Sequence, residues 1–148
     1  MSRLYYLFRV KPYAGRLVRT LRQAEKIYLF DGTEIGNEGA RFENLTALHL
    51  RKLVDAWTDI GFGEFDLHYV RDREKREVDF LITERRKPYA LIEAKLTARD
   101  VDASLLYFSE RMKPRYTVQV VRNPDGFKST MTTSGTILTP ASEFLALM

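Results

Sequence analysis

The fold of this chain is decided by residues 77–96, EVDFLITERRKPYALIEAKL. The segments 77–83, EVDFLIT, and 88–96, PYALIEAKL, contain short apolar runs and are predicted to form two β-strands. The residues between the two strands predict a hairpin loop at 84–88. The apolar runs predict that both strands are buried, and the rest of the chain is interpreted around this hairpin.

Two carboxylates of this hairpin are predicted to face each other. Side chains of a strand alternate between the two faces of its sheet, so Glu93 shares a face with Lys95. Pairing Thr83 with Tyr89 puts Asp79 directly opposite Glu93. Like charges across a sheet are destabilising, so a divalent cation or the ammonium of Lys95 must compensate them. The same alternation predicts two faces in the first strand, one with Glu77, Asp79 and Leu81 and the other with Val78, Phe80 and Ile82.

A third carboxylate is predicted to reach the same site from a helix. Residues 38–57, EGARFENLTALHLRKLVDAW, form the strongest helix signal in the chain, with Asn37 as the N-cap. Glu43 takes the first place of an otherwise apolar stripe, so its side chain is expected to face the sheet. Alternatively, Glu43 is only an acid near the start of the helix, where the macrodipole favours it. The other members of the stripe are Ala47, Leu50, Val54 and Trp57.

The remaining pattern predicts an α/β sandwich around a mixed sheet. A second helix, at 102–112, carries the apolar stripe Val101, Leu105, Phe108 and Met112. Further elements are predicted as strands at 3–10, 26–30, 66–70, 115–121 and 136–138, a short basic helical turn near 15–23, a turn at 123–126, a polar loop at 129–134 and a final helix from Pro140.

Composition excludes several classes of protein. The chain has 148 residues, 45% of them hydrophobic, which suits one globular domain with a core. It has no apolar run of about 18 residues and no signal-peptide core, so we expect a cytoplasmic protein without a membrane span. The absence of cysteine excludes disulfides, a thiol nucleophile and cysteine-held metals. With only His49 and His68 available, a metal must be held mainly by carboxylates, which favours Mg²⁺ or Mn²⁺.

Positive charge is concentrated near the amino terminus. The chain carries a net charge of +4, and residues 1–30 hold seven basic side chains against one acid. Basic residues interleaved with tyrosines suit a phosphate backbone, so Lys11, Arg16, Arg19 and Arg22 are candidates for DNA binding. Alternatively, this segment is a solvated face or a contact to another protein.

The acidic residues carry a resemblance to a known superfamily. Glu43, Asp79 and the later tripeptide Glu93-Ala94-Lys95 resemble the E…D…(D/E)xK signature of the PD-(D/E)XK nucleases. The segments FRVKPY, KIYLFD, ARFENLTALHL, EVDFLI and LIEAKL are similar to the domain of unknown function found carboxy-terminal to prokaryotic AAA-type ATPases. This similarity extends to about residue 122. The chain has no G-x-x-x-x-G-K-[ST] phosphate loop, because GFKST at 126–130 lacks the first glycine and the spacing.

The resemblance implies a restriction-endonuclease-like sandwich, with a central mixed sheet flanked by helices. Residues 36–148 are then the nuclease-like domain, and residues 1–35 are a basic segment packed on that core or linking to it. Since the phosphate loop is missing, an AAA-type ATPase partner is a separate polypeptide, or the chain is a fragment or a free-standing relative. A homodimer interface in place of a missing part is a further alternative.

The resemblance also implies a metal-dependent site that hydrolyses DNA. Asp79 and Glu93 are the implied ligands of Mg²⁺ or Mn²⁺, together with the Ala94 carbonyl and with Glu43 as an outer or second ligand. Lys95 is implied to position or activate the attacking water. The chemistry agrees, because carboxylate-held Mg²⁺ acidifies water and a nearby lysine stabilises charge on the phosphate.

Two other interpretations stay open at this point. The chain is alternatively a non-catalytic module with a nuclease-like fold, which binds nucleic acid or a partner ATPase without cleaving. The acidic residues are alternatively a buried ion-pair cluster, with Lys95 paired to Glu93 or Asp79. Binding of Mg²⁺ or Mn²⁺ by Asp79 and Glu93 separates these interpretations from the nuclease.

Overall fold

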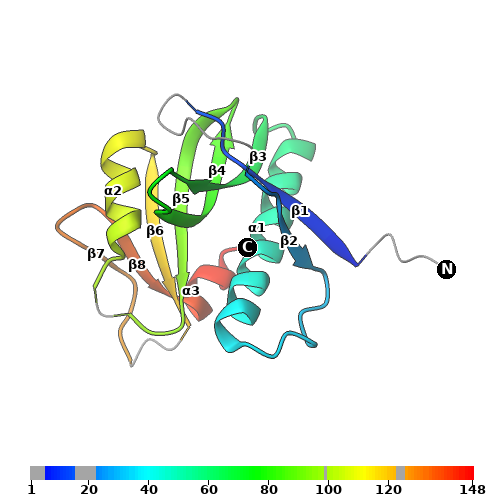
Figure 1. Ribbon diagram of the computed structural model, residues 1–148. Helices are drawn as coiled ribbons and strands as arrows, with labels where there is room; N and C mark the ends of the chain where they lie inside the picture. The colour runs from blue at the N-terminus through cyan, green and yellow to red at the C-terminus, as the bar shows by residue number, and fades with distance from the viewer. Residues whose placement is uncertain (1–5, 16–22, 99, 123–125) are drawn as a thin grey trace.

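One mixed β-sheet organises the part of the chain that the structure describes, which is residues 6–15, 23–98, 100–122 and 126–148 of a computed structural model (Figure 1). Its eight described strands run in the order β2-β1-β3-β4-β5-β6-β8-β7. They are β1 (Leu7–Pro12), β2 (Lys26–Leu29), β3 (Phe65–Arg71), β4 (Glu77–Glu84), β5 (Lys87–Lys95), β6 (Tyr116–Val121), β7 (Thr130–Met131) and β8 (Ile137–Pro140).

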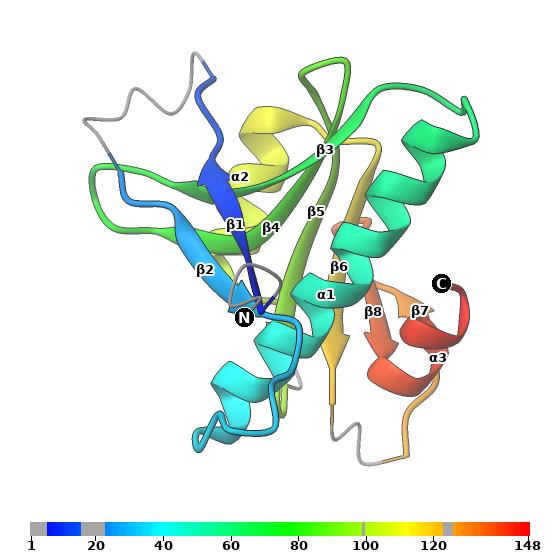
Figure 2. The same cartoon turned by 90° about the vertical axis from the view of Figure 1, so that its right-hand side faces the viewer.

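Helices cover both faces of this sheet, so the α/β class with a central mixed sheet is confirmed. Figure 2 shows α1 (Glu38–Asp59) and α3 (Ala141–Ala146) on one side and α2 (Ala103–Met112) on the other. None of the helices in the described ranges combines the length and the apolar character needed to cross a membrane.

The two long helices form where their sequence patterns place them. The Asn37 side chain accepts a hydrogen bond from the Ala40 N–H at 2.9 Å, so the predicted N-cap of α1 is confirmed. The apolar stripe of α1 packs on one face of the sheet and that of α2 on the other, because each helix buries only its apolar side. The buried stripe residues are Ala47, Leu50 and Val54 of α1 and Leu105, Phe108 and Met112 of α2.

Strand directions combine a meander with parallel crossovers. Strands β3, β4 and β5 pair antiparallel, whereas β5, β6 and β8 pair parallel, with α2 in the crossover between β5 and β6. Strand β1 pairs antiparallel with β2 and parallel with β3. The two amino-terminal strands therefore belong to the same sheet as the rest, and they cross β3 and β4 at an angle (Figure 2).

The central hairpin keeps the predicted register through most of its length. Phe80 pairs with Ile92 and Ile82 with Ala90, which is the predicted offset. The predicted pair of residues 83 and 89 is wrong, because a bulge pairs Thr83 with Pro88 instead. The predicted loop at 84–88 is also too long. The turn consists of Arg85 and Arg86, both with positive φ, as a two-residue hairpin turn requires.

A second irregularity in β4 overturns the predicted alternation of side chains. Val78 packs with Leu81 on the α2 face, whereas Phe80 packs on the α1 face, so the prediction that Val78 and Phe80 share a face is wrong. The cause is a register shift against β3, where residues 68 and 81 pair but the next pair is 70 with 78. Two β4 residues, Asp79 and Phe80, thus lie opposite one β3 residue. Such bulges redirect side chains, and here the redirected side chain is Asp79.

The carboxy-terminal part contains a short strand that the sequence pattern did not predict. The polar run 129–134 was expected to be a loop, but Thr130–Met131 forms β7 and pairs with β8. Two residues of strand carry too little periodicity to be detected from sequence. The predicted turn at 123–126 lies largely outside the described residues, and so does most of the basic helical turn predicted near 15–23.

Candidate functional site

The carboxylates of Asp79 and Glu93 lie where the paired part of β4 and β5 ends. The last ladder pair is Phe80 with Ile92, and continuing that register places Asp79 opposite Glu93. Here side chains take the place of the backbone ladder. The Asp79 N–H donates to Glu93 Oε2 at 3.0 Å, and the Ala94 N–H donates to Asp79 Oδ2 at 3.0 Å. Each carboxylate is therefore held by the backbone of the opposite strand.

These two carboxylates are largely removed from water. The Asp79 side chain is 14% exposed and that of Glu93 is 8% exposed. Burial, followed by repulsion from Glu93 and Glu43, raises the pKa of Asp79 well above its usual range. Burial also raises the pKa of Glu93, although the Asp79 N–H and Lys95 oppose it. The pair therefore places two acidic groups where ionisation is costly.

Lys95 lies beside Glu93 and connects it to the start of α2. Its Nζ is 3.0 Å from Glu93 Oε1 and 2.9 Å from Asp102 Oδ2. Asp102 is also the N-cap of α2, where its Oδ1 accepts the Ser104 N–H at 2.8 Å. Burial alone lowers the pKa of Lys95, but the Asp102 and Glu93 carboxylates outweigh it and raise that pKa. Lys95 is therefore a fixed ammonium group.

A second lysine, Lys26 of β2, lies on the other side of Asp79. Its Nζ is 2.5 Å from Glu77 Oε1, 3.2 Å from Glu43 Oε1 and 3.8 Å from Asp79 Oδ1. The Tyr28 hydroxyl donates to the same Glu43 oxygen at 2.7 Å. Glu43 thus faces the sheet, as its position in the α1 stripe predicted, but its nearest partners come from β2.

We call this set of seven charged residues the acid–lysine cluster. Of the predicted site residues, Glu43, Asp79, Glu93 and Lys95 belong to it, and Ala94 donates to it through its backbone N–H. The members that sequence reasoning missed as site residues are Lys26, Glu77 and Asp102. A signal for Lys26 existed, since it shares one face of the strand KIYLF with Tyr28.

A buried glutamine fixes the loop that carries Asp102. Gln119 of β6 has no exposed surface, accepts the Asp102 N–H at 2.7 Å and donates to the Asp100 carbonyl at 2.9 Å. Sequence reasoning also missed this residue, although one glutamine in the apolar strand YTVQVV is a signal. Because Glu93 pairs with Gln119 across the sheet, Gln119 places Asp102 within reach of Lys95.

The predicted DNA-binding residues are only partly described. Arg16, Arg19 and Arg22 lie outside the described residues. Lys11 of β1 is exposed and lines a hollow of about 410 Å³ together with the two arginines of the β4–β5 turn. This hollow shares no residue with the acid–lysine cluster, so the structure does not bring Lys11 together with Asp79 and Glu93.

The same hollow contains a half-buried histidine. His68 of β3 lies 3.7 Å from Asp66, and its side chain is 19% exposed. Burial lowers the pKa of His68, although Asp66 opposes the shift. His68 therefore lies in the hollow with Lys11 and is not one of the seven residues of the acid–lysine cluster.

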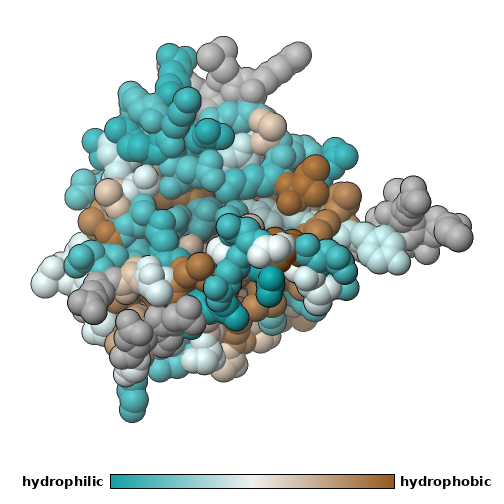
Figure 3. Space-filling view, turned by 60° about the horizontal axis from the view of Figure 1, so that its bottom comes forward, coloured by the Kyte–Doolittle hydropathy of each residue, from teal (hydrophilic) through white to brown (hydrophobic). Residues whose placement is uncertain are grey.

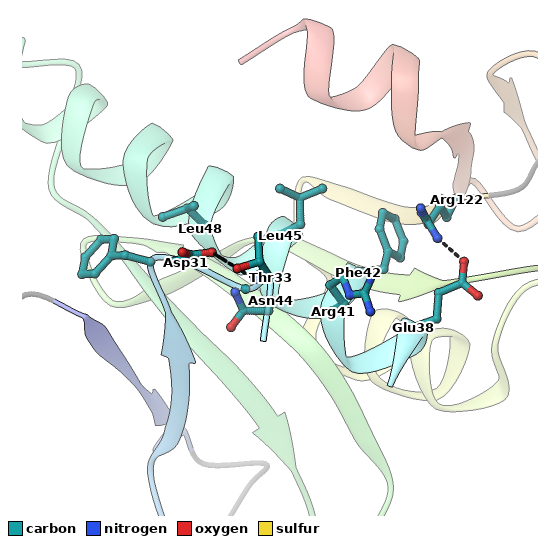
Figure 4. Close-up of a pocket in the computed structure, with 11 residues that line it drawn as sticks. Asp31, Thr33, Glu38, Arg41, Phe42, Asn44, Leu45, Leu48 and Arg122 are labelled. Carbon is teal, nitrogen blue, oxygen red and sulfur yellow. Dashed lines mark hydrogen bonds and ion pairs between the residues drawn. The ribbon is translucent and has the colours of Figure 1, made fainter. Parts of the chain in front are cut away.

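Two further hollows lie beside α1. One, of about 350 Å³, has apolar walls from α1 and the charged groups of Arg41, Glu38 and Arg122; Figure 4 shows Arg122 reaching Glu38. A shallower one, of about 250 Å³, is lined by Lys26, Tyr28 and Glu43. Of these two hollows, only the second is lined by members of the acid–lysine cluster, and it lies on the α1 side of that cluster.

The surface has no single large apolar area on the face shown in Figure 3, where hydrophobic residues are interspersed among hydrophilic ones. Exposed large hydrophobic side chains include Tyr6, Leu7, Ile27 and Phe30, from or beside β1 and β2. Charge and hydrogen bonding, not a deep apolar pocket, therefore characterise the candidate site.

The donor atoms of the cluster fit a hard divalent cation. They are carboxylate oxygens, which Mg²⁺ and Mn²⁺ prefer. Five carboxylates face two ammonium groups, and one further cation, Arg71, touches Glu77 at 3.6 Å, so negative charge is in excess. Within the described ranges, no three acidic or histidine side chains are gathered as metal ligands, and lysines contact the carboxylates.

The fold and this cluster define a class: an α/β protein in which two largely buried acids, flanked by partly exposed acids and lysines, lie where two central strands separate. The chain belongs to the family "Domain of unknown function (DUF4143)", whose model matches residues 38–143. The match begins at the first residue of α1 and contains Glu43, Asp79, Glu93 and Lys95, but not the two amino-terminal strands. No curated protein and no solved structure matches the chain.

Proposed function

We propose that this chain is a nuclease-fold domain that hydrolyses DNA phosphodiester bonds with Mg²⁺ or Mn²⁺. The observation that carries the proposal is the reciprocal bridge between Asp79 and Glu93, with Lys95 3.0 Å from Glu93. Two buried carboxylates held beside each other, with excess negative charge around them, are costly for stability and mark functional sites. The similarity to PD-(D/E)XK nucleases at the same residues supports this interpretation.

The proposed ligands are Asp79, Glu93 and the Ala94 carbonyl, with Glu43 as an outer group. A divalent cation bound there supplies an acidified water and stabilises charge on the phosphate. The backbone N–H groups that now bridge the strands orient both carboxylates, so little rearrangement is needed before binding. The Lys95 side chain is 35% exposed, so the substrate is proposed to approach from its side.

Lys95 is proposed to act as a positive charge. Its two carboxylate partners hold the ammonium in place, at 3.0 Å and 2.9 Å. A fixed ammonium donates hydrogen bonds to an attacking water and to the phosphate oxygen on which charge develops. The positioning role implied by the sequence resemblance is therefore favoured over proton abstraction by Lys95.

DNA contact is proposed at the basic residues near the amino terminus. Lys11 shares a hollow with Arg85 and Arg86, which together present three positive charges. Arg16, Arg19 and Arg22 are further candidates from the sequence. Because such cations release counterions from DNA, binding through them depends on salt. We also propose, from the sequence similarity, that the domain works with an AAA-type ATPase in the cytoplasm.

The proposal is tested by incubating the full chain with supercoiled, linear and single-stranded DNA in Mg²⁺, in Mn²⁺ or in excess chelator. Cleavage that requires the metal and is lost in the Asp79→Ala/Glu93→Ala double variant supports the proposal. Two exposed residues of α1, changed as Asp55→Ala/Lys52→Ala, are the control that must keep activity. No cleavage of any of these substrates in either metal contradicts it.

A second candidate function is a non-catalytic module that binds nucleic acid or a partner ATPase. The observation that favours it is the double ion pairing of the cluster, since Lys26 and Lys95 each contact the carboxylates proposed as ligands. In that case the cluster is structural, and neither Mg²⁺ nor Mn²⁺ raises the melting temperature. Calorimetric titration with the two metals separates the candidates without any assay of cleavage.

A further inference from the structure

Unpaired positive charge gathers at the hollow of about 410 Å³ beside the turn of the central hairpin. The walls of this hollow come from the end of β1, the start of β3 and the β4–β5 turn. Lys11, Arg85 and Arg86 line it, are exposed, and form no ion pair with an acid among the described residues. The arginines that do pair with acids are elsewhere and include Arg9, Arg51, Arg71, Arg76, Arg111 and Arg122. A concave site lined by cations without partners attracts an anion.

The two arginines occupy backbone positions that do not favour them. Arg85 has a φ of 47° and Arg86 a φ of 67°, both in the left-handed region. Two-residue hairpin turns with two positive φ angles prefer Asn-Gly, because a larger side chain is unfavourable in this region. Both guanidinium groups are thus present against the preference of the backbone, as is common at functional sites.

The turn that carries the arginines is fixed to the other walls of the hollow. The Arg85 N–H donates to the Glu64 carbonyl at 2.8 Å. The Tyr13 hydroxyl donates to the Arg86 carbonyl at 3.3 Å. Because the backbone of the turn is already held at both residues, a ligand of the hollow has less chain to order when it binds.

We infer that this hollow binds the phosphorylated terminal nucleotide of a DNA strand. The inference rests on the proposed function, which supplies DNA as the partner, and deepens it by naming the part of the DNA that is recognised. A terminal phosphate is a monoester with a charge of about −1.5 to −2 near neutral pH and three acceptor oxygens. Arg85, Arg86 and Lys11 offer three cationic groups to those oxygens.

Two acids in the hollow favour a doubly charged ligand over a singly charged one. Glu64 and Asp66 also line it, and Arg51 lies 3.4 Å from Asp66. Burial lowers the pKa of His68, so this histidine adds little charge at neutral pH. The lining groups therefore leave a small positive excess. In the same field, a ligand with two negative charges gains about twice the attraction of a backbone phosphate with one.

The hollow has room for a nucleotide and not only for its phosphate. Its volume of about 410 Å³ lies in the range of small-molecule sites, which is about 300–1,000 Å³. The half-buried rings of Tyr13 and Phe65 line it as well. Aromatic rings stack on bases with little preference for sequence, so these two residues suit a terminal base of any kind.

The hollow is remote from the proposed cleavage site. Along β4, the turn lies about 20 Å from Asp79 at about 3.3 Å per residue, and the hollow shares no residue with the acid–lysine cluster. Recognition of a strand end is therefore measurable without metal and without cleavage.

The test is fluorescence anisotropy of the full chain in chelator, with a duplex that carries a label at one end. The other end has a 5′-phosphate, a 3′-phosphate or only hydroxyl groups. Wild type is expected to bind one of the phosphorylated duplexes about tenfold more tightly than the hydroxyl duplex. Deoxythymidine 5′-monophosphate is added as a competitor, to distinguish a strand end from a free nucleotide.

The matched variants separate charge from folding. Arg85→Asn/Arg86→Gly removes both arginines and gives the turn the sequence that it prefers, so its melting temperature should equal or exceed that of wild type. This variant is expected to bind the phosphorylated and hydroxyl duplexes equally. Lys52→Ala/Lys128→Ala removes two exposed cations outside the hollow and must keep the tenfold preference.

Each result has a defined meaning. Loss of the preference in the turn variant alone supports the inference. Equal affinity of wild type for all three duplexes, or a preference that survives in the turn variant, overturns the inference and leaves the proposed DNA contact and metal site intact. Competition by the free nucleotide at the concentration at which the phosphorylated duplex binds overturns the assignment to a strand end. No binding of any duplex by wild type overturns the inference together with the proposed DNA contact.

Discussion

The Glu93 carboxylate accepts the backbone N–H of Asp79 at 3.0 Å, and the Asp79 carboxylate accepts the N–H of Ala94, the residue after Glu93. Two acids on neighbouring strands thus bridge the gap left where the ladder between those strands ends. The bridge satisfies backbone donors that otherwise remain unpaired in a buried place. It also holds two like charges side by side, and several measurable consequences follow from that conflict.

Asp79→Asn is expected to stabilise the metal-free protein. The amide oxygen can still accept the Ala94 N–H, while the repulsion from Glu93 and Glu43 disappears. Changes of this kind commonly raise the free energy of unfolding by about 0.5–2 kcal/mol. Thermal melting in chelator measures this change in stability. Added Mn²⁺ should then raise the melting temperature of the variant less than that of wild type. A lower melting temperature in chelator would mean that the charge on Asp79 stabilises the fold.

Lys95→Ala is expected to abolish metal-dependent cleavage and to leave binding of Mn²⁺ and DNA largely intact. Loss of one oxyanion-stabilising donor costs about 100-fold or more in rate. Because the Lys95 side chain is 35% exposed, its loss should lower the free energy of unfolding by only about 1–2 kcal/mol after solvent screening. Paired melting and plasmid-cleavage assays measure both effects. Lys95 belongs to a structural ion pair if the wild-type protein cleaves no DNA and the Lys95→Ala variant loses more stability than this range.

Gln119→Leu is expected to loosen the start of α2. The substitution leaves the Asp102 N–H and the Asp100 carbonyl without their buried partner. An unsatisfied buried group costs about 1–3 kcal/mol. Amide hydrogen exchange should show faster exchange at Asp102 and in the first turn of α2, with little change in α1. Unchanged protection at Asp102 would show that Gln119 does not fix this loop.

Burial of His68 predicts a specific dependence of stability on pH. Its pKa is lowered in the folded state, so the unfolded chain takes up the proton first as the pH falls below about 6.5. The stability that neutral His68 contributes is complete above that pH and is lost as the pH falls through the lowered folded pKa. Wild type should therefore lose more stability between pH 7 and pH 5 than His68→Gln does. Chemical unfolding at both pH values measures the difference, and equal losses contradict the prediction.

Neutralising Arg16, Arg19 and Arg22 together is expected to weaken binding to duplex DNA. Each lost phosphate contact should reduce the slope of log affinity against log salt by roughly one. Fluorescence anisotropy with a labelled duplex at several salt concentrations measures this slope. Lys52→Ala, on an exposed part of α1, is the control. An unchanged slope in the triple variant assigns these arginines to a protein partner.

Local patterns in the sequence determine much of this molecule. Alternation in residues 77–96 predicts the hairpin and its offset, so Asp79 and Glu93 could be placed opposite each other without a structure. The stripes of α1 and α2 follow from the helical period, and the Asn37 cap follows from side-chain chemistry. All of these depend on residues close in the chain, whose spacing alone carries the information.

Only the tertiary structure decides which residues surround Asp79. Its bulge arises from pairing with β3, and that pairing breaks the alternation that the sequence predicts. Lys26 reaches Glu43, Glu77 and Asp79 although β1 and β3 separate its strand from β4 in the sheet. The order and crossing of strands come from contacts between residues far apart in sequence. No local period encodes such contacts, so the hairpin could be predicted from the sequence, whereas the contacts of Lys26 with the three acids could not.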